Sequence, residues 1–343
     1  VFETYYDTIY ERSMGNRKLI VMMPDHSIVV SHEYRNFYSL FDSDGNFVRE
    51  FSITGEAGKP FENTKKIKGV INHHFFTELD NLGKMICCDF YGNYVKTLTL
   101  NYMTKDMIPL TEHQFAVVGW VLWKDKNRDF VALINYQTNE QKIIWDRFND
   151  RMESEPYTYP PRISFVNIYL LVALPKENEI RIYDLNGKLI SKKSLEWSNL
   201  YMSVEEQKEM VIRRMEALKK RAEASGKRID EPFIEKMLKG WEGELKKITT
   251  PLKLPAFSTI IKDSDENVLF FEIPEEEGAN VFHVWVYKDG GEFICRSSFE
   301  CEDYNLSITP DKMIFRDGYI YGLQTLKHAE GNPLRLVRFR LSN

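Results

Sequence analysis

Apolar and polar positions in this chain form a series of short segments that show either two-residue alternation or a continuous apolar run, as β-strands do. Tight turns rich in Asp, Asn and Gly separate many of these segments. Such turns favour hairpins, because Gly, Asn and Asp tolerate positive φ. Five hairpins of this kind are predicted, with turns at residues 42–46, 89–93, 135–139, 184–188 and 288–291.

The turns recur with a regular period. Matching turn positions at Gly45, Gly92, Thr138 and Gly187 are separated by 47, 46 and 49 residues, and Gly291 follows after 104, close to two periods. A repeat of about 40 to 50 residues that holds roughly four short strands is the period of a β-propeller blade. Continuous apolar runs earlier in each unit suit inner strands, which neighbouring blades bury on both faces.

The two ends of the chain complete this pattern. A last, partial unit supplies three strand-like segments within residues 313–339, and one unpaired segment at residues 4–10 opens the chain. Pairing an N-terminal strand at about residues 1–12 with the last unit would close the ring and remove a sheet edge. We therefore predict a single all-β domain over residues 1–343, a six-bladed β-propeller.

Residues 203–248 break the strand pattern and predict an inserted α-helical hairpin between blades four and five. Ser203 and Glu206 form a capping box at the start of the first helix, and Asp230 followed by Pro232 starts the second. Apolar residues then recur at helical spacing, among them Val211, Met215, Leu218, Met237 and Trp241. The two stripes are expected to pack on each other and on the propeller. A lid or docking arm over one face of the ring is the open alternative.

Composition supports a folded, strand-rich chain. Hydrophobic residues make up 43% of the 343 residues and aromatic residues 13%, which allows a sizeable core and favours strands. The net charge of −5 gives no basic excess that would favour nucleic acid or an anionic membrane surface. No apolar run approaches the roughly 18 residues that a transmembrane segment needs, so none is predicted.

The cysteines and the first residue bear on the compartment. Adjacent Cys87 and Cys88 would point to opposite faces of a strand, and Cys295 and Cys301 are six residues apart. Since neither a CxxC pair nor zinc spacing occurs, we expect four free thiols, mostly packed as small hydrophobes. A chain that starts at Val1 has often lost a signal peptide, although a fragment would look the same.

Three segments carry a resemblance to a known class of propeller. Residues 39–48 resemble the strand–turn–strand of an NHL repeat, residues 55–60 are similar to the Gly- and Pro-containing loop between its blades, and residues 7–10 resemble a segment frequent in that family. The chain thus resembles the six-bladed NHL and TolB-like β-propellers, common among secreted and lipid-anchored bacterial proteins. The resemblance implies an extracytoplasmic protein, periplasmic or at the cell surface, with any lipid anchor outside this chain. It carries over no catalytic residue, because the family has no single activity.

Motifs that carry chemistry are absent from the sequence, which contains no HExxH, GxSxG, P-loop or GxGxxG. Residues 42–45 lack the spaced acceptors and distal Glu of a calcium loop. We therefore predict no catalytic residue, metal site or cofactor. Propellers bind ligands at the mouth of the axial channel through loops from several blades. The loops before the third strands supply the candidate ligand-binding residues Glu33, Arg35, Asp125, Arg128 and His328, although mixed charge is also typical of an ordinary solvated surface.

Two functional hypotheses follow. The preferred one is a non-catalytic, extracytoplasmic protein that binds a protein or small-molecule partner through one face of the propeller, beside the helical hairpin. The alternative is a propeller hydrolase or lyase that acts on a sugar or lactone with a divalent metal ion in the central channel. That alternative needs convergent Glu, Asp, Asn or His side chains at the axis. Sequence does not separate a pure scaffold from the first hypothesis, and it names no ligand or partner.

Overall fold

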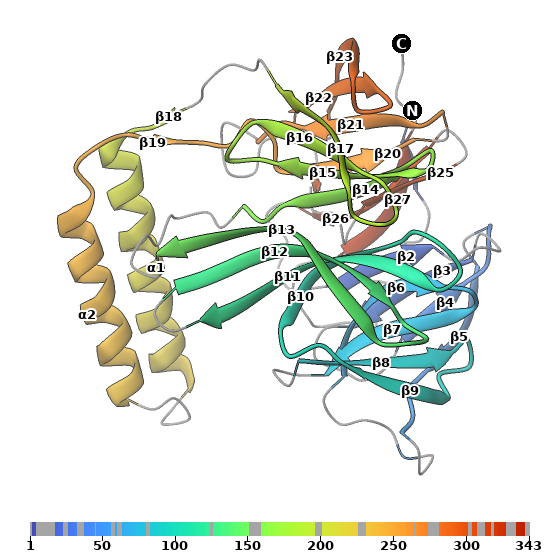
Figure 1. The fold of residues 1–343 in the computed structure, drawn as a ribbon. Coiled ribbons are helices and arrows are strands. Elements are labelled where there is room, and N and C mark those ends of the chain that lie inside the picture. Colours follow the sequence, from blue (N-terminus) through green and yellow to red (C-terminus); the bar gives the residue numbers. More distant parts are fainter. Residues whose placement is uncertain are drawn as a thin grey trace.

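Strands dominate the computed structural model of the chain, and the all-β propeller predicted from the repeat is confirmed (Figure 1). The structure describes residues 2–4, 18–22, 27–32, 38–44, 46–55, 59, 64–79, 83–123, 126–150, 159–195, 201–225, 231–263, 265–273, 281–300, 304–306, 313–316, 319–326 and 334–339. Five sheets have four antiparallel strands each, and within each sheet the strands follow one another in sequence order. These five sheets are blades.

The first three blades contain twelve strands. Blade one is β2 (Lys18–Met22), β3 (Ile28–His32), β4 (Tyr38–Phe41) and β5 (Phe47–Phe51). Blade two is β6 (Thr64–Ile71), β7 (His74–Leu79), β8 (Lys84–Asp89) and β9 (Tyr94–Thr99). Blade three, whose strands are longer, is β10 (Met103–Pro109), β11 (Gln114–Trp123), β12 (Lys126–Asn135) and β13 (Glu140–Asp150).

The next two blades flank the helices in sequence. Blade four is β14 (Arg162–Val166), β15 (Tyr169–Leu174), β16 (Glu179–Tyr183) and β17 (Leu189–Ser194). Blade five is β20 (Thr259–Lys262), β21 (Asn267–Phe271), β22 (Val281–Lys288) and β23 (Glu292–Glu300).

The remaining sheet joins the two ends of the chain. It contains β1 (Phe2–Thr4), β24 (Tyr304–Leu306), β25 (Met313–Arg316), β26 (Tyr319–Leu326) and β27 (Leu334–Phe339). Strand β1 pairs antiparallel with β27, with Phe2 opposite Phe339. Both β24 and β25 pair with β26, so this sheet departs from the four-stranded pattern. The structure therefore shows five regular blades, and the predicted count of six is not confirmed.

The first strand of each blade lies next to the first strand of its neighbours, because β2 contacts β6, β6 contacts β10, β10 contacts β14 and β14 contacts β20. We call β2, β6, β10, β14, β20 and β25 the inner strands, since β25 in turn contacts both β20 and β2. The end of the ring where the inner strands begin is the loop end. The opposite end, which carries the short turns within each sheet, is the turn end.

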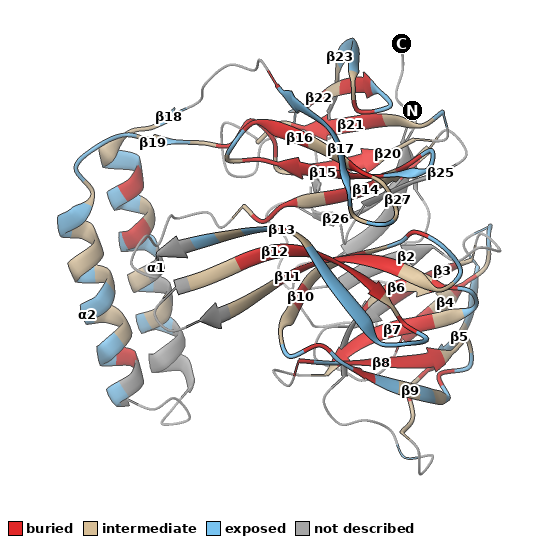
Figure 2. Cartoon of the chain, viewed as in Figure 1, coloured by how far each residue is buried: buried red, intermediate tan, exposed pale blue. Residues whose placement is uncertain are grey.

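Hydrophobic clusters fill the space between neighbouring blades. One cluster joins Phe76 and Met85 of blade two to Phe115 and Phe130 of blade three, and comparable clusters join blades one and two, three and four, and four and five. Figure 2 shows that burial is concentrated in the inner parts of the sheets, whereas every residue of the outermost strand β17 is exposed. Each fully buried Phe contributes roughly 1.5–3 kcal/mol to stability.

The cysteines follow the strand geometry expected from sequence. Cys87 packs into the cluster shared with blade three, and Cys88 packs into the cluster shared with blade one. Both are free, as is exposed Cys295, whereas Cys301 lies outside the described residues. Burial raises the pKa of the Cys87 thiol to about 11 despite nearby Lys96, which opposes the rise. The two buried thiols are therefore protonated at neutral pH and serve as packing groups.

Three of the predicted turns, those that begin at Asp42, Asp89 and Asp184, form with a shared hydrogen-bond pattern. At Asp42, Oδ1 accepts the backbone N–H groups of Asp44 and Asn46 at 3.0 and 2.7 Å, and Oδ2 accepts Nδ2 of Asn46 at 3.0 Å. The same three bonds recur between Asp89 and its followers at Tyr91 and Asn93. These carboxylates are thus committed to closing their own turns.

A cation seven residues after the turn Asp or Asn links each of the first three blades to the next. Arg49 Nη2 donates to the carbonyl of Phe90 at 2.9 Å, Lys96 Nζ donates to the carbonyl of Tyr136, and Lys142 Nζ donates to the carbonyl of Asn186 at 2.6 Å. These bonds satisfy carbonyls of the next blade's turn. They therefore hold neighbouring blades in register at the turn end.

The helical hairpin is α1 (Val204–Ser225) and α2 (Glu231–Lys247), inserted between β17 and β20. The capping box is present: Ser203 N–H donates to Glu206 Oε2 at 2.7 Å, and Glu206 N–H donates to Ser203 Oγ at 3.2 Å. A two-stranded ribbon of β18 (Tyr201–Met202) and β19 (Leu252–Lys253) carries the pair. The helices lie at the loop end, near the tips of β11 to β13 (Figure 1).

The helices bury little of their surface. Val211 and Ile234 are buried, whereas Met237 and Trp241 stay partly exposed. Gln207 of α1 connects the segments that enter and leave the helical pair, because its Nε2 donates to the carbonyls of Thr250 and Met202 at 2.9 and 3.2 Å. The two helices contact each other, and the packing of their apolar stripes on each other and on the propeller stays a prediction.

Candidate functional site

Arg128 alone among the five predicted ligand-binding residues falls in the described part of the chain; Glu33, Arg35, Asp125 and His328 lie outside it. Arg128 lies on β12 and donates two hydrogen bonds, from Nε and Nη2, to Asp146 Oδ2 on β13 at 2.9 and 2.7 Å. Its guanidinium also lies 5.3 Å from the ring centre of Phe148. Arg128 therefore lies within the third strand of blade three rather than in the predicted loop before it, and Asp146 of its own blade holds its guanidinium.

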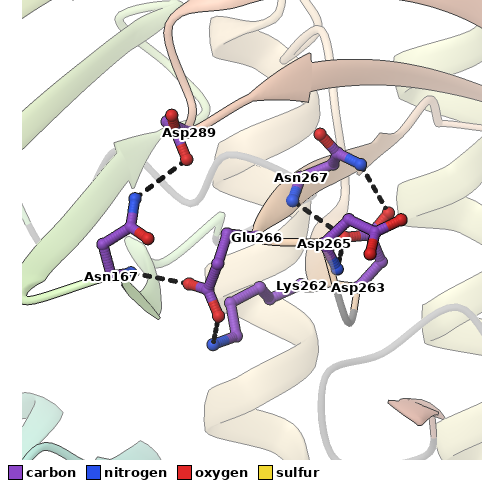
Figure 3. A network of polar contacts seen from close by, with 7 residues as sticks. All are labelled: Asn167, Lys262, Asp263, Asp265, Glu266, Asn267 and Asp289. Atoms are coloured by element: carbon purple, nitrogen blue, oxygen red, sulfur yellow. Dashed lines mark hydrogen bonds and ion pairs between the residues drawn. The ribbon is translucent and has the colours of Figure 1, made fainter. Parts of the chain in front are cut away.

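A second group of charges lies at the turn end between blades four and five (Figure 3). Glu266 accepts the backbone N–H of Asn167 at 2.6 Å and pairs with Lys262 at 2.7 Å, while Asn167 Nδ2 donates to Asp289 at 2.9 Å. Burial opposes ionisation of Glu266, but the bonds from Lys262 and Asn167 outweigh it and lower the pKa of this carboxyl. The group links two blades by hydrogen bonds.

Nearby Asp263 uses both carboxylate oxygens within its own turn, because Oδ1 accepts the N–H groups of Asp265 and Asn267 and Oδ2 accepts Nδ2 of Asn267. This is the pattern seen at Asp42 and Asp89. Of the carboxylates in Figure 3, Asp263 therefore repeats the turn chemistry of the other blades, whereas Glu266 and Asp289 join blade five to Asn167 of blade four. We interpret them as structural.

The loop end of blade two differs, because Glu78 there occupies a position that blades three and four fill with apolar residues. Glu78 pairs with Met85, and Met85 is four residues before the turn residue Asp89. The equivalent residue is Val118 in blade three, which pairs with Val131, and Ala173 in blade four, which pairs with Ile180. All three residues are buried, and Glu78 is only 5% exposed. A buried carboxylate in this register needs partners that the repeat itself does not supply.

Those partners come from two blades. Glu78 Oε1 accepts the backbone N–H of Thr104, the second residue of β10, at 2.8 Å. Glu78 Oε2 lies 3.4 Å from Nζ of Lys68 on β6, and the same ammonium donates to the carbonyl of Thr104. The Lys68–Glu78 pair thus clamps both backbone groups of Thr104 and connects inner strands β6 and β10.

Bulges in the two inner strands place the lysines. The pairing of β6 with β7 shifts between Ile67 and Gly69, which leaves Lys68 as the extra residue. Pairing of β10 with β11 shifts between Thr104 and Asp106, which leaves Lys105 as the extra residue. Strands β2, β14, β20 and β25 pair with their neighbours without a shift. Bulges re-aim side chains, so these two strands are adapted at the point where their lysines lie.

Lys105 leads into a second ionic group. Its Nζ donates to Oδ1 of buried Asp129 on β12 at 2.8 Å, and Arg147 Nη2 on β13 lies 3.6 Å from Asp129 Oδ2. Arg147 Nη1 continues to Glu177 of blade four at 2.8 Å. The Arg147 guanidinium also lies 5.7 Å from the ring centre of Trp145. Together with Lys68 and Glu78 these residues form a network in which cations and carboxylates balance.

Blade four adds one more buried carboxylate at this end. Glu179 accepts a hydrogen bond from Arg181 Nε at 2.6 Å and pairs with Lys192. Burial opposes ionisation of Glu179, but the hydrogen bonds from Lys192 and Arg181 outweigh it and lower the pKa of the carboxyl. Glu179 is therefore ionised throughout the neutral range.

The loop-end network holds buried polar atoms without a hydrogen-bond partner within the described residues, namely Oγ1 of Thr77, Oγ1 of Thr104 and Nε of Arg147. Unsatisfied buried groups cost about 1–3 kcal/mol each, so such positions are expected to bind water or ligand. Among the described residues, no three His, Cys, Asp or Glu side chains lie close enough together to hold a metal ion. Three polar atoms of this region thus keep hydrogen-bonding capacity that the described residues do not use.

Sequence reasoning did not single out Lys68, Lys105 or Asp129. A usable signal was present for their neighbour Glu78. Aligning the blades on the turn Asp places Glu78 in register with Val118 and Ala173, which marks it as a charge at a core position. The bulges left no comparable signal, because lysines are common near strand ends. Their placement depends on pairing with the second strand.

Comparison with known proteins supports the fold. No family model matches the chain, and no curated protein matches it. A member of the DUF4221 family from Bacteroides vulgatus has a similar structure, with a TM-score of 0.58 and 10% identity over 100% of this chain and 96% of that one. A putative exported protein from Bacteroides fragilis is similar with a TM-score of 0.52 and 11% identity, over 100% and 95% of the two chains.

Identities this low speak to fold alone. No helix in the part of the chain that the structure describes is both long and apolar enough to cross a membrane. Neither similar structure confirms the more specific resemblance to NHL and TolB-like propellers. The chain therefore shares the β-propeller fold of these two Bacteroides proteins over nearly its whole length.

Proposed function

We propose that this protein is a non-catalytic binding propeller that engages its partner through the loop end, beside the helical pair. One observation carries the proposal: the features that break the repeat gather at this end. They are the bulged lysines, the buried carboxylates, the lengthened strands of blade three and the inserted helices. At the other end, the turns of Asp42, Asp89, Asp184 and Asp263 repeat one structural pattern instead.

We further propose that the sheet of β1 and β24 to β27 acts as a sixth blade, so that residues 1–343 form one closed domain. Contacts of β25 with both β2 and β20 support this, as does the pairing of β1 with β27. Closure by the N-terminal strand ties the two ends of the chain together. Kinship with NHL and TolB-like propellers is part of the same proposal and rests on the turn residues.

The proposed place of action is outside the cytoplasm. The similar protein from Bacteroides fragilis is described as a putative exported protein, which supports this location. Protease treatment of intact and of permeabilised cells tests it directly. An extracytoplasmic protein is cleaved, or released from the periplasm, while a cytosolic marker stays intact. Protection equal to that of the cytosolic marker would contradict the location.

Excision of the helical pair tests the binding role. Because Met202 pairs with Leu252, residues 203–251 can be replaced by an Asn-Gly turn that joins β18 to β19. The shortened protein is expected to keep its circular dichroism spectrum and melting temperature within a few degrees. It is expected to lose a partner that the full chain retains from cell-envelope extract.

A matched control probes the opposite end. Tyr91 is 72% exposed at the turn end, so Tyr91→Ser should retain the same partner. The proposal would be contradicted if the shortened chain retained the partner as well as the full chain does. It would also be contradicted if the shortened chain and Tyr91→Ser lost the partner equally. The hydrolase or lyase alternative draws no support from a described group of residues, and its candidates Glu33, Asp125 and His328 remain predictions.

A further inference from the structure

The helical pair is tied to itself more firmly than to the blades. Gln207 of α1 donates from Nε2 to the carbonyls of Met202 and Thr250, which closes the base of the pair. Within α1, Arg213 Nη2 donates to Glu209 Oε1 at 2.8 Å. The two helices contact each other, and within the described residues neither helix contacts any strand of a blade as extensively. Two bodies that share only a small interface are expected to move relative to each other.

The connection between the helical pair and the ring is narrow. Strands β18 and β19 form a separate two-stranded sheet, in which Tyr201 pairs with Lys253 and Met202 pairs with Leu252. We call these four residues the neck. Tyr201 is 59% exposed, and Lys253 is exposed as well. Neither side chain of this first pair is therefore packed into the core of a blade.

Both legs of the neck are fixed to the ring at one residue, Asn178. The backbone carbonyl of Asn178 accepts the N–H of Leu195 at 2.7 Å, and its Oδ1 accepts the N–H of Ala256 at 3.4 Å. Asn178 has a φ of 49°, a left-handed conformation that Asn tolerates better than most residues. Leu195 and Ala256 both lie in the hydrophobic cluster between blades four and five. The ring side of each leg is thus held in place.

The leg that leads from the neck to Ala256 consists of Leu254 and Pro255 alone. Pro255 is buried and Leu254 is half-buried. The proline ring fixes its own φ and restricts Leu254 to extended conformations. A bend between neck and ring is therefore confined to a few backbone dihedral angles, as in a short hinge.

The length of the helices amplifies any bend at the neck. Helix α1 has 22 residues, which corresponds to about 33 Å. A rotation of about 10° at its base moves its far end by about 6 Å. Figure 1 shows the helices beside the tips of β11 to β13, so such a rotation changes how closely the pair approaches the loop end of blade three.

We propose that the helical pair is a hinged arm, in which α1, α2 and the neck move as one body relative to the ring. Leu254 and Pro255 form the hinge, and Asn178 holds both legs on the ring side. The swing opens and closes the loop end beside blade three. Its use in holding a partner rests on the proposed function, but the motion belongs to the free protein and is tested without a partner, separately from the excision of the helices.

Distances between pairs of spin labels on the full chain, measured by double electron–electron resonance, test the hinge. Labels are attached at four exposed positions by Tyr91→Cys, Lys219→Cys, Lys246→Cys and Lys288→Cys. Cys295→Ser and Cys301→Ser remove the other reactive thiols, since Cys87 and Cys88 are buried. The ring–arm pair is Tyr91 with Lys219. The arm pair, Lys219 with Lys246, and the ring pair, Tyr91 with Lys288, share its labels and serve as controls.

The distance distribution of the ring–arm pair is expected to be about twice as wide as that of either control pair. Pro255→Gly frees the fixed φ of the hinge and should widen the ring–arm distribution by about half again, with both control pairs unchanged. Pro251→Gly is the matched variant, because Pro251 is exposed and lies between α2 and β19, within the arm. It should leave the ring–arm distribution as it is.

Three results would overturn the hinge. A ring–arm distribution in the unchanged background that is as narrow as the control pairs would mean that the arm is fixed to the ring. An arm pair as broad as the ring–arm pair would mean that the helices do not move as one body. Equal widening by Pro251→Gly and Pro255→Gly would place the bend within the arm instead of at its connection to the ring.

Discussion

The two ends of the ring use the same residue types for different purposes. At the turn end, Asp and Asn close their own turns, and a cation seven residues later binds the next blade. At the loop end, Glu78 and Asp129 are buried, and the described residues at the Glu78 position in blades three and four are the apolar Val118 and Ala173. Their lysine partners stand on bulges found in blades two and three but not in the other described inner strands.

This comparison teaches how to interpret charge in a repeat fold. A residue that recurs at the blade period solves a problem that each blade has, such as turn closure or blade-to-blade contact. A buried charge that appears once solves a problem that belongs to the whole molecule. Asp263 in Figure 3 belongs to the first class, and the Lys68–Glu78 pair belongs to the second.

The largest expected effect is at that pair. Glu78→Gln keeps the side-chain shape and an acceptor for the Thr104 N–H but removes the charge beside Lys68, which is only 10% exposed. A buried ammonium left without its counter-charge is expected to lower the free energy of unfolding by about 3–5 kcal/mol. Urea unfolding followed by circular dichroism measures the change.

The double variant Lys68→Met with Glu78→Gln separates charge from packing. With no charge left, it should recover to within about 1 kcal/mol of the wild type. Glu177→Gln, at the more exposed edge of the same network, should cost less than about 1 kcal/mol. A Glu78→Gln protein as stable as Glu177→Gln would show that the buried pair is no different from the surface ones.

Much of the fold could be predicted because its signals are local. The turn Asp residues, the apolar runs and the capping box at Ser203 each act within a few residues, and each formed as predicted. The predicted blade count of six was not confirmed, because β24 and β25 both pair with β26. That choice depends on partners distant in sequence.

The candidate site was harder to predict for the same reason. Arg128 was predicted in a loop but lies in strand β12, and Lys68 and Lys105 owe their positions to bulges that only pairing with β7 and β11 reveals. Glu78 could have been found by comparing blades position by position. The predictions for Glu33, Arg35, Asp125 and His328 stay predictions, since those residues lie outside the described part of the chain.

A turn glycine gives the next largest effect. Gly92 has a φ of 88°, and a Cβ there would lie 2.5 Å from the carbonyl oxygen of Ser52. Gly92→Ala is therefore expected to cost about 2 kcal/mol, from backbone strain and from the clash between blades one and two. Gly240 lies within α2, and a methyl group added there would meet no atom within 4 Å, so Gly240→Ala should stabilise by about 0.5–1 kcal/mol.

Opposite signs for these two substitutions are the test, measured as shifts in the urea midpoint. A neutral Gly92→Ala would mean that the turn relaxes without cost and that the repeated turn end tolerates more change than its hydrogen bonds suggest. A destabilising Gly240→Ala would mean that the helical pair packs against something at that face.

Acid titration tests the ionic group around Glu179 at the loop end. The pKa of Glu179 is lowered in the folded protein, so its contribution is complete above the usual Glu pKa of about 4.3 and is lost as the pH falls through the folded value. Glu179→Gln should cost about 1–2 kcal/mol at pH 7, because its partners Arg181 and Lys192 are partly exposed. The difference from the wild type should shrink as the pH falls towards 3, and a constant difference would contradict the linkage.

The smallest effect belongs to the exposed links between blades at the turn end. Lys142→Met removes the hydrogen bond to the Asn186 carbonyl but leaves that carbonyl open to water, so the expected cost is about 0.5 kcal/mol. Lys96→Met should cost nearer 1 kcal/mol, because Lys96 also lies 4.9 Å from the ring centre of Tyr136 and is partly buried. In 1 M salt, the stability cost of each variant should fall only by the part that comes from the charge of the lysine. If either variant lost as much stability as Glu78→Gln, the repeated links would equal the buried pair in importance, and the division between the two ends would fail.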